Sequence, residues 1–378
     1  MVIDKIKLEN NITNRVNKDI ESNNILGANV YVFQNGKVLI DRSYGYKTVE
    51  GKIKLGKNHI FRLASMTKPI VAAAVLKLIE QGRIDLFDRA DNFLEGFNGF
   101  YIGKLQDGKV VPVKKAENPI RILDLLTHTS GLVCGDFMEA YGKQMTEKDK
   151  KNLDSAIEFY KTTCLSFESY CGNSYSPVAG FDVLAKIIEI VSDLDIEDFL
   201  KKEIFMPLEM SDTTFTPNKE QWERLVDMHD KVDGKNVSID MKGHIFADFP
   251  TSYKCGGAGL VSTIKDYAVF AEMLLNGGEY SGVRVLKEST VRSMRLPHIL
   301  EMYSNPYESW GLGVRVIKDG YPFLAKNSFG WSGAYGTHFW VDPDNKIVAI
   351  YMKNSFYDGG SGAITAARFE EDVKNSMD

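Results

Sequence analysis

Ser65 and Lys68 stand three positions apart, in the order Ser65-Met66-Thr67-Lys68, at the start of an apolar segment. Because residues three apart share one face of a helix, the lysine amino group can reach the serine hydroxyl. Burial disfavours the charge of an ammonium, so a buried lysine can supply or support the base that takes the hydroxyl proton. The spacing therefore predicts nucleophilic chemistry at Ser65, where the free N–H groups of the helix start would stabilise negative charge.

The same spacing occurs a second time, at Ser262 and Lys265. That serine comes just before a helical pattern at Asp266–Leu275, and we expect it to be the N-cap, a common role of serine. Spacing by itself is therefore weak evidence for catalysis, and the surrounding sequence has to distinguish the two copies.

Several ordered segments resemble the serine β-lactamase and penicillin-binding-protein superfamily, and within it the class C β-lactamases and the related carboxylesterases. They are F-R-L-A-S-M-T-K-P-I around Ser65, L-L-T-H-T-S-G-L at Leu125–Leu132, P-L-E-M-S-D-T-T-F at Pro207–Phe215, G-G-A-G-L-V-S-T at Gly256–Thr263 and G-W-S-G-A-Y-G-T-H-F-W-V-D-P near the C-terminus. The pattern of this superfamily includes an S-x-x-K. The resemblance implies that Ser65 forms an acyl-enzyme with the help of Lys68.

The resemblance also implies a proton relay at Tyr175, which stands in the place of the family's Y-x-N. Such a tyrosine would move the proton between the nucleophile and the leaving group. Pro177 stands where the family has an asparagine that holds the substrate amide, and proline has neither a side-chain amide nor a backbone N–H. The nearby Asn173 cannot be assumed to replace it.

The third family element, K-T-G or H-x-G, corresponds here to Trp331-Ser332-Gly333, followed by Ala334. We expect an edge strand that lines the substrate pocket, with Gly333 allowing close approach of the backbone. The resemblance implies that the N–H groups of Ala334 and Ser65 form an oxyanion hole. Trp331 carries no charge and offers a single N–H, so it cannot bind a lactam carboxylate as a lysine would. A tryptophan at this place resembles the carboxylesterases of the same fold.

The six histidines show no spacing that is typical of a metal site. They are His59, His128, His229, His244, His298 and His338. We expect His128 to be structural, with a hydrogen bond to backbone near the site, and His338 to be structural on a strand. No metal and no cofactor are expected.

Hydrophobic patterns predict one antiparallel sheet built from both ends of the chain, with helices on its faces. A helix at residues 4–23 precedes a hairpin, Ala28–Gln34 and Lys37–Ser43, which turns at Asn35-Gly36. Further predicted elements are the helices Ile70–Glu80, Ile120–Leu126, Phe181–Val191, Ile196–Ile204 and Gly362–Ser376, and the strands Trp310–Ile317, Gly336–Val341 and Lys346–Met352. We thus expect an α/β (α+β) fold of the β-lactamase and transpeptidase type. Residues 1–85 and 255–378 would form the sheet domain, and residues 86–254 an inserted, mostly helical domain.

The composition is that of a globular chain of 378 residues with a net charge of −5. Basic residues form no stripe, so nucleic acid is not an expected partner. No signal peptide and no membrane-spanning segment are recognised, and we expect a cytoplasmic protein. The four cysteines give no disulfide framework and are expected to be reduced and mostly buried.

These features predict a serine hydrolase, and most specifically a carboxylesterase that acts on small neutral esters. A β-lactamase or D-amino-acid peptidase would share the mechanism, on an amide in place of an ester. An acyltransferase would pass the same acyl group to an alcohol or amine. An inactive binding or sensor module would keep the fold alone, but intact Ser65, Lys68 and Tyr175 argue against it.

Overall fold

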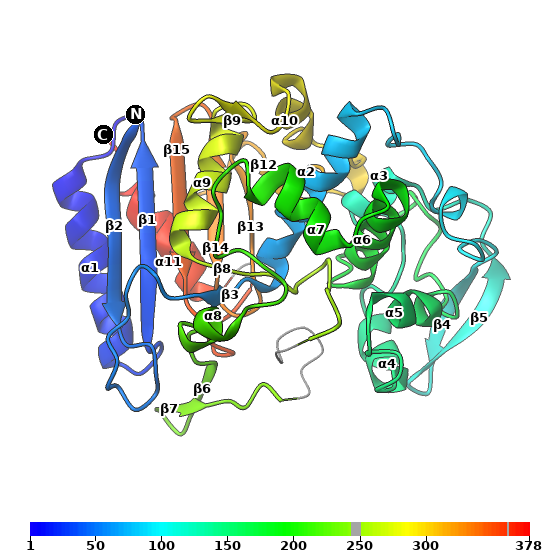
Figure 1. Ribbon diagram of the computed structural model, residues 1–378, viewed down its shortest axis with the longest axis horizontal. Helices are drawn as coiled ribbons and strands as arrows, with labels where there is room; N and C mark the ends of the chain where they lie inside the picture. Colours follow the sequence, from blue (N-terminus) through cyan, green and yellow to red (C-terminus); the bar gives the residue numbers. More distant parts are fainter. Residues whose placement is uncertain (243–250, 361–362) are drawn as a thin grey trace.

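The computed structural model describes residues 1–242, 251–360 and 363–378. At its centre lies a seven-stranded antiparallel sheet with the strand order β11-β12-β13-β14-β15-β1-β2 (Figure 1). Its strands are β1 (Gly27–Gln34), β2 (Lys37–Gly45), β11 (Glu308–Trp310), β12 (Arg315–Ile317), β13 (Phe329–Ser332), β14 (His338–Asp342) and β15 (Ile347–Met352). The two ends of the chain thus share one sheet because β1 pairs with β15, as the sequence predicts.

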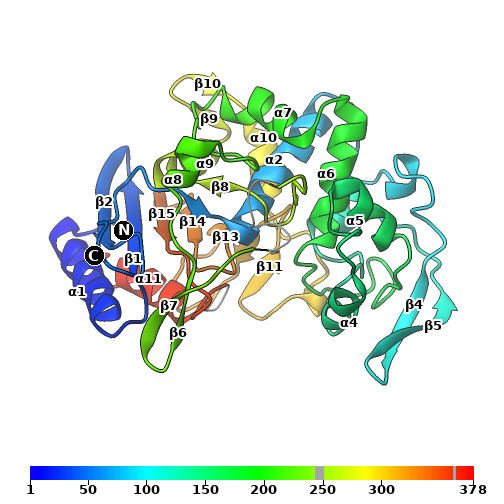
Figure 2. The same ribbon diagram turned by 60° about the horizontal axis from the view of Figure 1, so that its bottom comes forward.

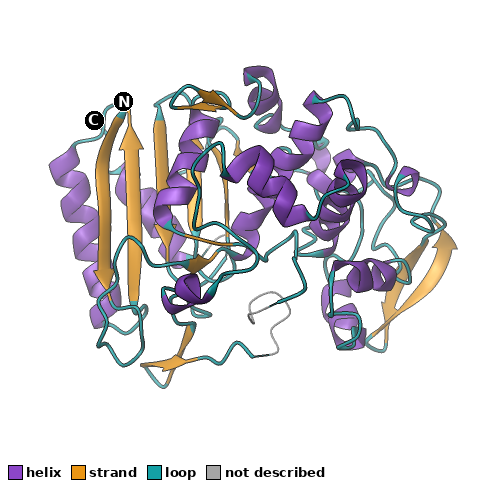
Figure 3. Ribbon diagram, in the orientation of Figure 1, coloured by secondary structure: helices purple, strands orange, loops and turns teal. Residues whose placement is uncertain are grey.

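Helices cover both faces of this sheet. Helices α1 (Lys5–Glu21) and α11 (Ile364–Lys374) pack on one face, and α2 (Thr67–Glu80) and α9 (Ile264–Leu275) pack on the other (Figures 1 and 3). Alternate residues of β1 enter the two cores: Val30 packs beneath α1, and Tyr31 packs on the side of α2. Since both faces are covered, every residue of β1 is buried.

In the chain between β3 (Phe61–Arg62) and its partner β8 (Val261–Ser262), α2 is followed by a segment that we call the helical part, which contains six further α-helices among the described residues. Its helices are α3 (Ile122–Leu126), α4 (Phe137–Gln144), α5 (Leu153–Tyr160), α6 (Ala179–Ser192), α7 (Ile196–Leu200) with a π-helical turn at Lys201–Phe205, and α8 (Lys219–Glu223). Two hairpins accompany them, β4 (Tyr101–Gln106) with β5 (Lys109–Lys115), and β6 (His229–Val232) with β7 (Lys235–Ser238). The expected domain boundaries at residues 85 and 255 stay a prediction, and residues 243–250 lie outside the described part.

Four short elements and one helix complete the fold: 3₁₀ turns at Ala90–Asn92 and Glu301–Tyr303, the paired strands β9 (Glu279–Tyr280) and β10 (Val283–Arg284), and helix α10 (Glu288–Met294). None of the helices in the described ranges is long and apolar enough to cross a membrane. The four cysteines are free, as expected, but only Cys134 and Cys255 are buried, and Cys171 is exposed.

One strand prediction needs correction, and one hairpin of the helical part was missed. Trp310–Ile317 is not one strand, because the chain reverses between β11 and β12, where Gly311 donates to Val314 O and Gly313 has a φ of 75°. The hairpin β4–β5 was not predicted; it projects at the outer edge of the helical part (Figure 2). Its strands have no fully buried residue and so lack a clear apolar alternation. The signal that could have found it is the turn Asp107-Gly108, with both φ angles positive.

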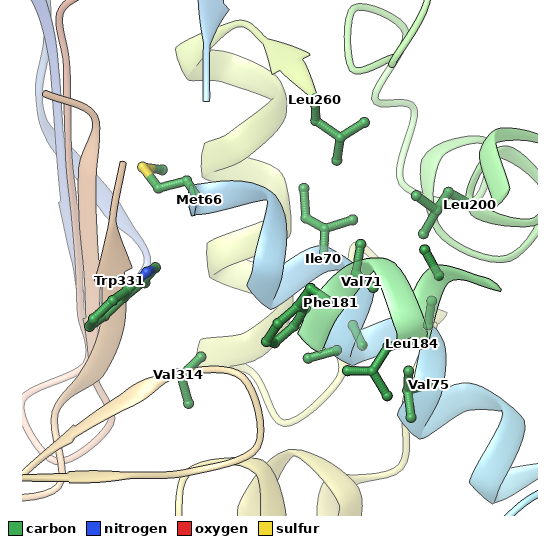
Figure 4. Packing of buried hydrophobic residues seen from close by; sticks show 14 of the residues in the cluster. Met66, Ile70, Val71, Val75, Phe181, Leu184, Leu200, Leu260, Val314 and Trp331 are labelled. Atoms are coloured by element: carbon green, nitrogen blue, oxygen red, sulfur yellow. The ribbon is translucent and has the colours of Figure 1, made fainter. Parts of the chain in front are cut away.

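Helix α2 runs through the main core and is apolar around most of its circumference. Figure 4 shows Ile70, Val71 and Val75 of α2 beside Phe181 and Leu184 of α6. Trp331 of β13 faces the start of the same helix from the sheet (Figure 4). A helix that is apolar all round needs partners on all sides. The start of α2 is therefore held between the sheet and the helical part. It carries Lys68, and Ser65 lies in the turn directly before it.

Candidate active site

Ser65 lies in a 3₁₀ turn, Ala64–Met66, that leads directly into α2. Its side chain is 9% exposed, whereas that of Lys68 is completely buried. Lys68 Nζ donates to Ser65 Oγ at 3.2 Å, to Pro177 O at 2.6 Å and to Gly257 O at 2.8 Å. An ammonium has three N–H donors. The three acceptors satisfy all of them and hold the amino group at the serine hydroxyl.

The backbone around this pair is tightly constrained. Ala64 has a φ of 46°, in the left-handed region that residues other than glycine rarely adopt. The turn is braced from the side of β8, since Leu63 N donates to Leu260 O at 3.0 Å. Gly257 has no room for a side chain, because a Cβ there would lie 2.8 Å from Pro177 O. This glycine lets the two carbonyl groups converge on one ammonium.

Tyr175 is brought to Ser65 from the segment that precedes α6. Its hydroxyl lies 2.7 Å from Ser65 Oγ, and Trp331 Nε1 donates to the same Tyr175 oxygen at 3.3 Å. Lys68 Nζ lies 5.0 Å from the centre of the Tyr175 ring. The structure thus brings Ser65, Lys68, Tyr175 and Trp331 together.

Trp310 belongs to this cluster although the sequence did not mark it. Its ring stacks on Tyr175, with centroids 5.9 Å apart and planes inclined by 8°, and lies 4.6 Å from the ring of Trp331. Trp310 ends β11. The sequence analysis predicted β11 and β12 as a single strand, so it gave no reason to place Trp310 at the site. The stacked ring restricts how Tyr175 can rotate.

His128 supports the tyrosine segment from behind. Its Nδ1 accepts a hydrogen bond from Ser176 N at 3.2 Å, which confirms the expected bond to backbone. Burial, together with the nearby charge of Lys68, holds the pKa of His128 well below its usual range. The ring therefore stays neutral and fixes the chain on both sides of Tyr175 by packing and by this bond.

Pro177 contributes its carbonyl group to the site and no side-chain amide. Asn173 does not replace the missing amide, because its Nδ2 donates to Thr127 O at 3.0 Å and to His128 O at 3.2 Å. The carbonyl acceptors of Pro177 and Gly257 could not have been found from side-chain types. They depend on where two distant loops pass over Lys68.

Strand β13 is an inner strand, and the expectation of an edge strand is wrong. It pairs with β12 on one side and with β14 on the other. Gly333 follows it, and a Cβ there would lie 2.1 Å from Leu63 O. This close approach places the next residue, Ala334, beside the turn that holds Ser65. Among the described residues, neither the Ala334 N–H nor the Ser65 N–H has a hydrogen-bond acceptor.

Ser332 points to the other face of the sheet from Trp331, as alternation along a strand requires. It is 3% exposed, and its Oγ lies 2.7 Å from His338 Nδ1. The structure therefore does not support the expected contact between its side chain and substrate.

The second S-x-x-K copy is built differently. Ser262 is buried in β8 beside Thr213 Oγ1, at 2.8 Å, and Lys265 is exposed. The N-cap of α9 is Thr263, which accepts from Asp266 N, so the expected capping by Ser262 is wrong. Of the two copies, only Ser65 and Lys68 contact each other.

Within the described ranges no group of histidine, cysteine and carboxylate side chains could hold a metal ion. His244 lies outside those ranges. A cavity of about 750 Å³ has Arg62 and Met228 in its wall, but none of Ser65, Lys68, Tyr175 and Trp331 lines it. Met228 of this wall packs with Ala64 and Tyr335.

Comparisons with known proteins agree on one family. The model of the family described as "Beta-lactamase" matches residues 9–371. Protein Rv1367c of Mycobacterium tuberculosis is 27% identical over 345 residues, which cover 86% of this chain and 85% of that protein. A putative D-alanyl-D-alanine carboxypeptidase of Salmonella typhimurium is 25% identical over 376 residues, covering 92% and 82%.

A solved structure shows the same fold. "EstCE1, a hydrolase with promiscuous acyltransferase activity" superposes with a TM-score of 0.83 over 98% of each chain, at 22% identity. The superposition supports an antiparallel sheet with flanking helices as the common architecture.

Proposed function

This chain belongs to the beta-lactamase family, and we propose that within these serine hydrolases it is a carboxylesterase that forms an acyl-enzyme at Ser65. The observation that carries the proposal is the convergence of Lys68 Nζ and Tyr175 Oη on Ser65 Oγ, at 3.2 and 2.7 Å. A nucleophile within hydrogen-bond reach of its base is the signature of covalent catalysis.

In the proposed acylation, Ser65 Oγ attacks the ester carbonyl carbon and its proton moves to the Tyr175 oxygen. The Tyr175 proton passes to the alkoxide that leaves, so an alcohol is released and Tyr175 is restored. Lys68 keeps its bonds to Pro177 O and Gly257 O and stabilises the charge that develops between Ser65 and Tyr175. Water then enters in place of the alcohol and reverses the proton path to release the acid.

The negative oxygen of the tetrahedral intermediate would lie between the N–H groups of Ser65 and Ala334. Both groups lack an acceptor among the described residues, and the Gly333–Leu63 contact holds their segments side by side. Losing one such donor typically costs about 100- to 1000-fold in rate.

The charges around the site favour a neutral substrate. Lys68 is buried with three acceptors, so it offers no free N–H to a substrate carboxylate, and Trp331 takes the place of a family cation. A small neutral ester needs no compensating charge in such a site.

The decisive experiment compares wild type, Ser65→Ala and Ser262→Ala with a short-chain nitrophenyl ester and a chromogenic cephalosporin, each followed by turnover and by intact mass. We expect ester turnover and a transient acyl adduct in wild type and Ser262→Ala, and neither in Ser65→Ala. Absence of turnover and adduct in wild type contradicts the enzyme proposal. Efficient cephalosporin turnover without ester turnover contradicts the substrate class.

An acyltransferase is the second candidate, because the same acyl-enzyme can react with an alcohol. EstCE1, which shares the fold, is described as a hydrolase that also has promiscuous acyltransferase activity. Adding a primary alcohol to the ester assay distinguishes the two: a transferase forms mainly the new ester, whereas a hydrolase forms mainly the acid.

A further inference from the structure

We propose that His338 is a positioning residue for the oxyanion hole, and that it acts through Ser332 at the base of the turn that carries Ala334. The proposal rests on the proposed function, because it assigns a task to side chains behind the same site. Its basis is a buried chain of polar groups that runs from Ser332 through His338 to Glu370.

The first contact closes the ends of the turn. Ser332 ends β13 and His338 begins β14, and the two residues are direct partners in the register of the strands. Ser332 Oγ lies 2.7 Å from His338 Nδ1, and Gly333 N donates to Thr337 O at 2.7 Å. One side-chain and one backbone bond therefore lock the ends of the turn, and Ala334 lies between them.

The second contact ties this lock to helix α11. His338 Nε2 lies 3.1 Å from Glu370 Oε1, and Arg315 donates to the same oxygen at 2.7 Å. Tyr321 donates to the other oxygen, Glu370 Oε2, at 2.9 Å. Arg315 also donates to Glu308 at 2.9 Å, so two carboxylates face this one guanidinium. Strands β11, β12, β13 and β14 are thus tied to α11 by one cluster.

The charges of the cluster determine where the histidine proton lies. Glu370 is ionised, since its pKa is lowered to about 2 by His338 and Arg315 in spite of burial. Burial lowers the pKa of His338, so the ring is neutral. His338 Nε2 has no partner with hydrogen-bond geometry among the described residues, but it faces the Glu370 carboxylate at 3.1 Å, and we therefore assign the ring proton to Nε2. Nδ1 is then an acceptor, and the Ser332 hydroxyl donates to it.

The arrangement resembles a serine–histidine–acid triad, but its geometry excludes a nucleophile. Ser332, His338 and Glu370 are 3%, 1% and 2% exposed, and they lie on the face of the sheet away from Ser65. Substrate cannot reach the Ser332 hydroxyl. The cluster can instead hold the turn in one conformation, so that the Ala334 N–H stays directed at the carbonyl oxygen of the substrate. A misplacement of about 1 Å can cost 100-fold in rate.

The test measures transition-state stabilisation separately from folding. Ser332→Ala and His338→Gln break the two ends of the Ser332–His338 bond. Tyr351→Phe is the matched control: Tyr351 is the partner of His338 in β15, and its hydroxyl has no hydrogen-bond partner among the described residues. Each protein is assayed for kcat and KM with a nitrophenyl ester, for inhibition by phenylboronic acid, which forms a tetrahedral adduct with an active-site serine, and for Tm.

We expect Ser332→Ala to lower kcat/KM about tenfold, mainly through kcat, and to weaken boronate inhibition by a similar factor. Tyr351→Phe should change neither value. The proposal is overturned if folded Ser332→Ala and His338→Gln stay within twofold of wild type, or if the rate falls while boronate inhibition is unchanged. Wild type that neither turns over ester nor binds boronate contradicts the proposed function instead.

Discussion

The Tyr175 hydroxyl lies 2.7 Å from Ser65 Oγ across a separation of 110 residues in the chain. Neither residue belongs to the other's local structure: Ser65 precedes α2, and Tyr175 precedes α6. Their contact exists because α2 and α6 pack against each other in the main core. The proposed proton relay is therefore a product of core packing.

Replacing Tyr175 by phenylalanine should remove the relay and keep the ring that stacks on Trp310. General acid–base groups contribute 100- to 10,000-fold, so we expect kcat to fall about a thousandfold. Steady-state ester hydrolysis measures the effect. Tyr307→Phe, at a side chain that is 49% exposed, should keep full activity. Activity of Tyr175→Phe within threefold of wild type would show that another group moves the proton.

Lys68→Met and Lys265→Met form a matched pair, since each lysine ends an S-x-x-K. Lys68→Met leaves two buried carbonyl groups without a donor, at a cost of about 1–3 kcal/mol each, and should lower kcat at least about a thousandfold. Lys265 is exposed, and its replacement should change neither stability nor rate. Urea unfolding and ester hydrolysis test both variants. Equal behaviour of the two lysines would contradict the assignment of the first copy as the active one.

Trp331→Phe removes the N–H that donates to Tyr175 and keeps an aromatic ring in contact. A hydrogen bond to a group that gains charge is worth about 1.5 kcal/mol or more, so kcat should fall about tenfold or more. Trp310→Phe is the comparison, because it makes the ring that stacks on Tyr175 smaller and leaves the hydrogen bond from Trp331 to Tyr175 in place. A larger loss in Trp310→Phe than in Trp331→Phe would show that stacking matters more than the N–H.

Glu370 should make the stability of the fold depend on acid pH. Its folded pKa of about 2 lies below the unfolded value, so the unfolded chain takes up the proton first as the pH falls. The contribution is complete above about pH 4.5 and is lost towards pH 2, and it amounts to about 3 kcal/mol.

Glu370→Gln leaves the buried Arg315 guanidinium without this charged partner and should destabilise the fold by about 3 kcal/mol at pH 7. The difference from wild type should shrink between pH 4.5 and 3, as measured by urea unfolding at several pH values. A difference that stays constant over this range would contradict an ionised Glu370.

The helices and hairpins that depend on neighbouring residues could be predicted from the sequence. The α1 helix, the β1–β2 hairpin with its Asn-Gly turn and the α2 helix depend on periodicity and turn residues within short segments. The hairpin β4–β5 was not predicted, because its strands are exposed and their sequences do not alternate between apolar and polar residues. The strands β11 and β12 were predicted as one strand because Gly311 and Gly313 lie inside a mostly apolar run.

The sequence by itself singled out Ser65 and Lys68, because their spacing permits contact and the ordered motifs around them distinguish this copy from Ser262 and Lys265. It also supplied the ordered motifs by which Tyr175 and Ala334 were assigned. Only the tertiary structure decided which S-x-x-K copy is assembled, since the acceptors of Lys68 are backbone carbonyls of Pro177 and Gly257. Likewise, β13 became an inner strand with Ser332 turned to α11, because the pairing of distant strands and the packing of both sheet faces depend on long-range contacts.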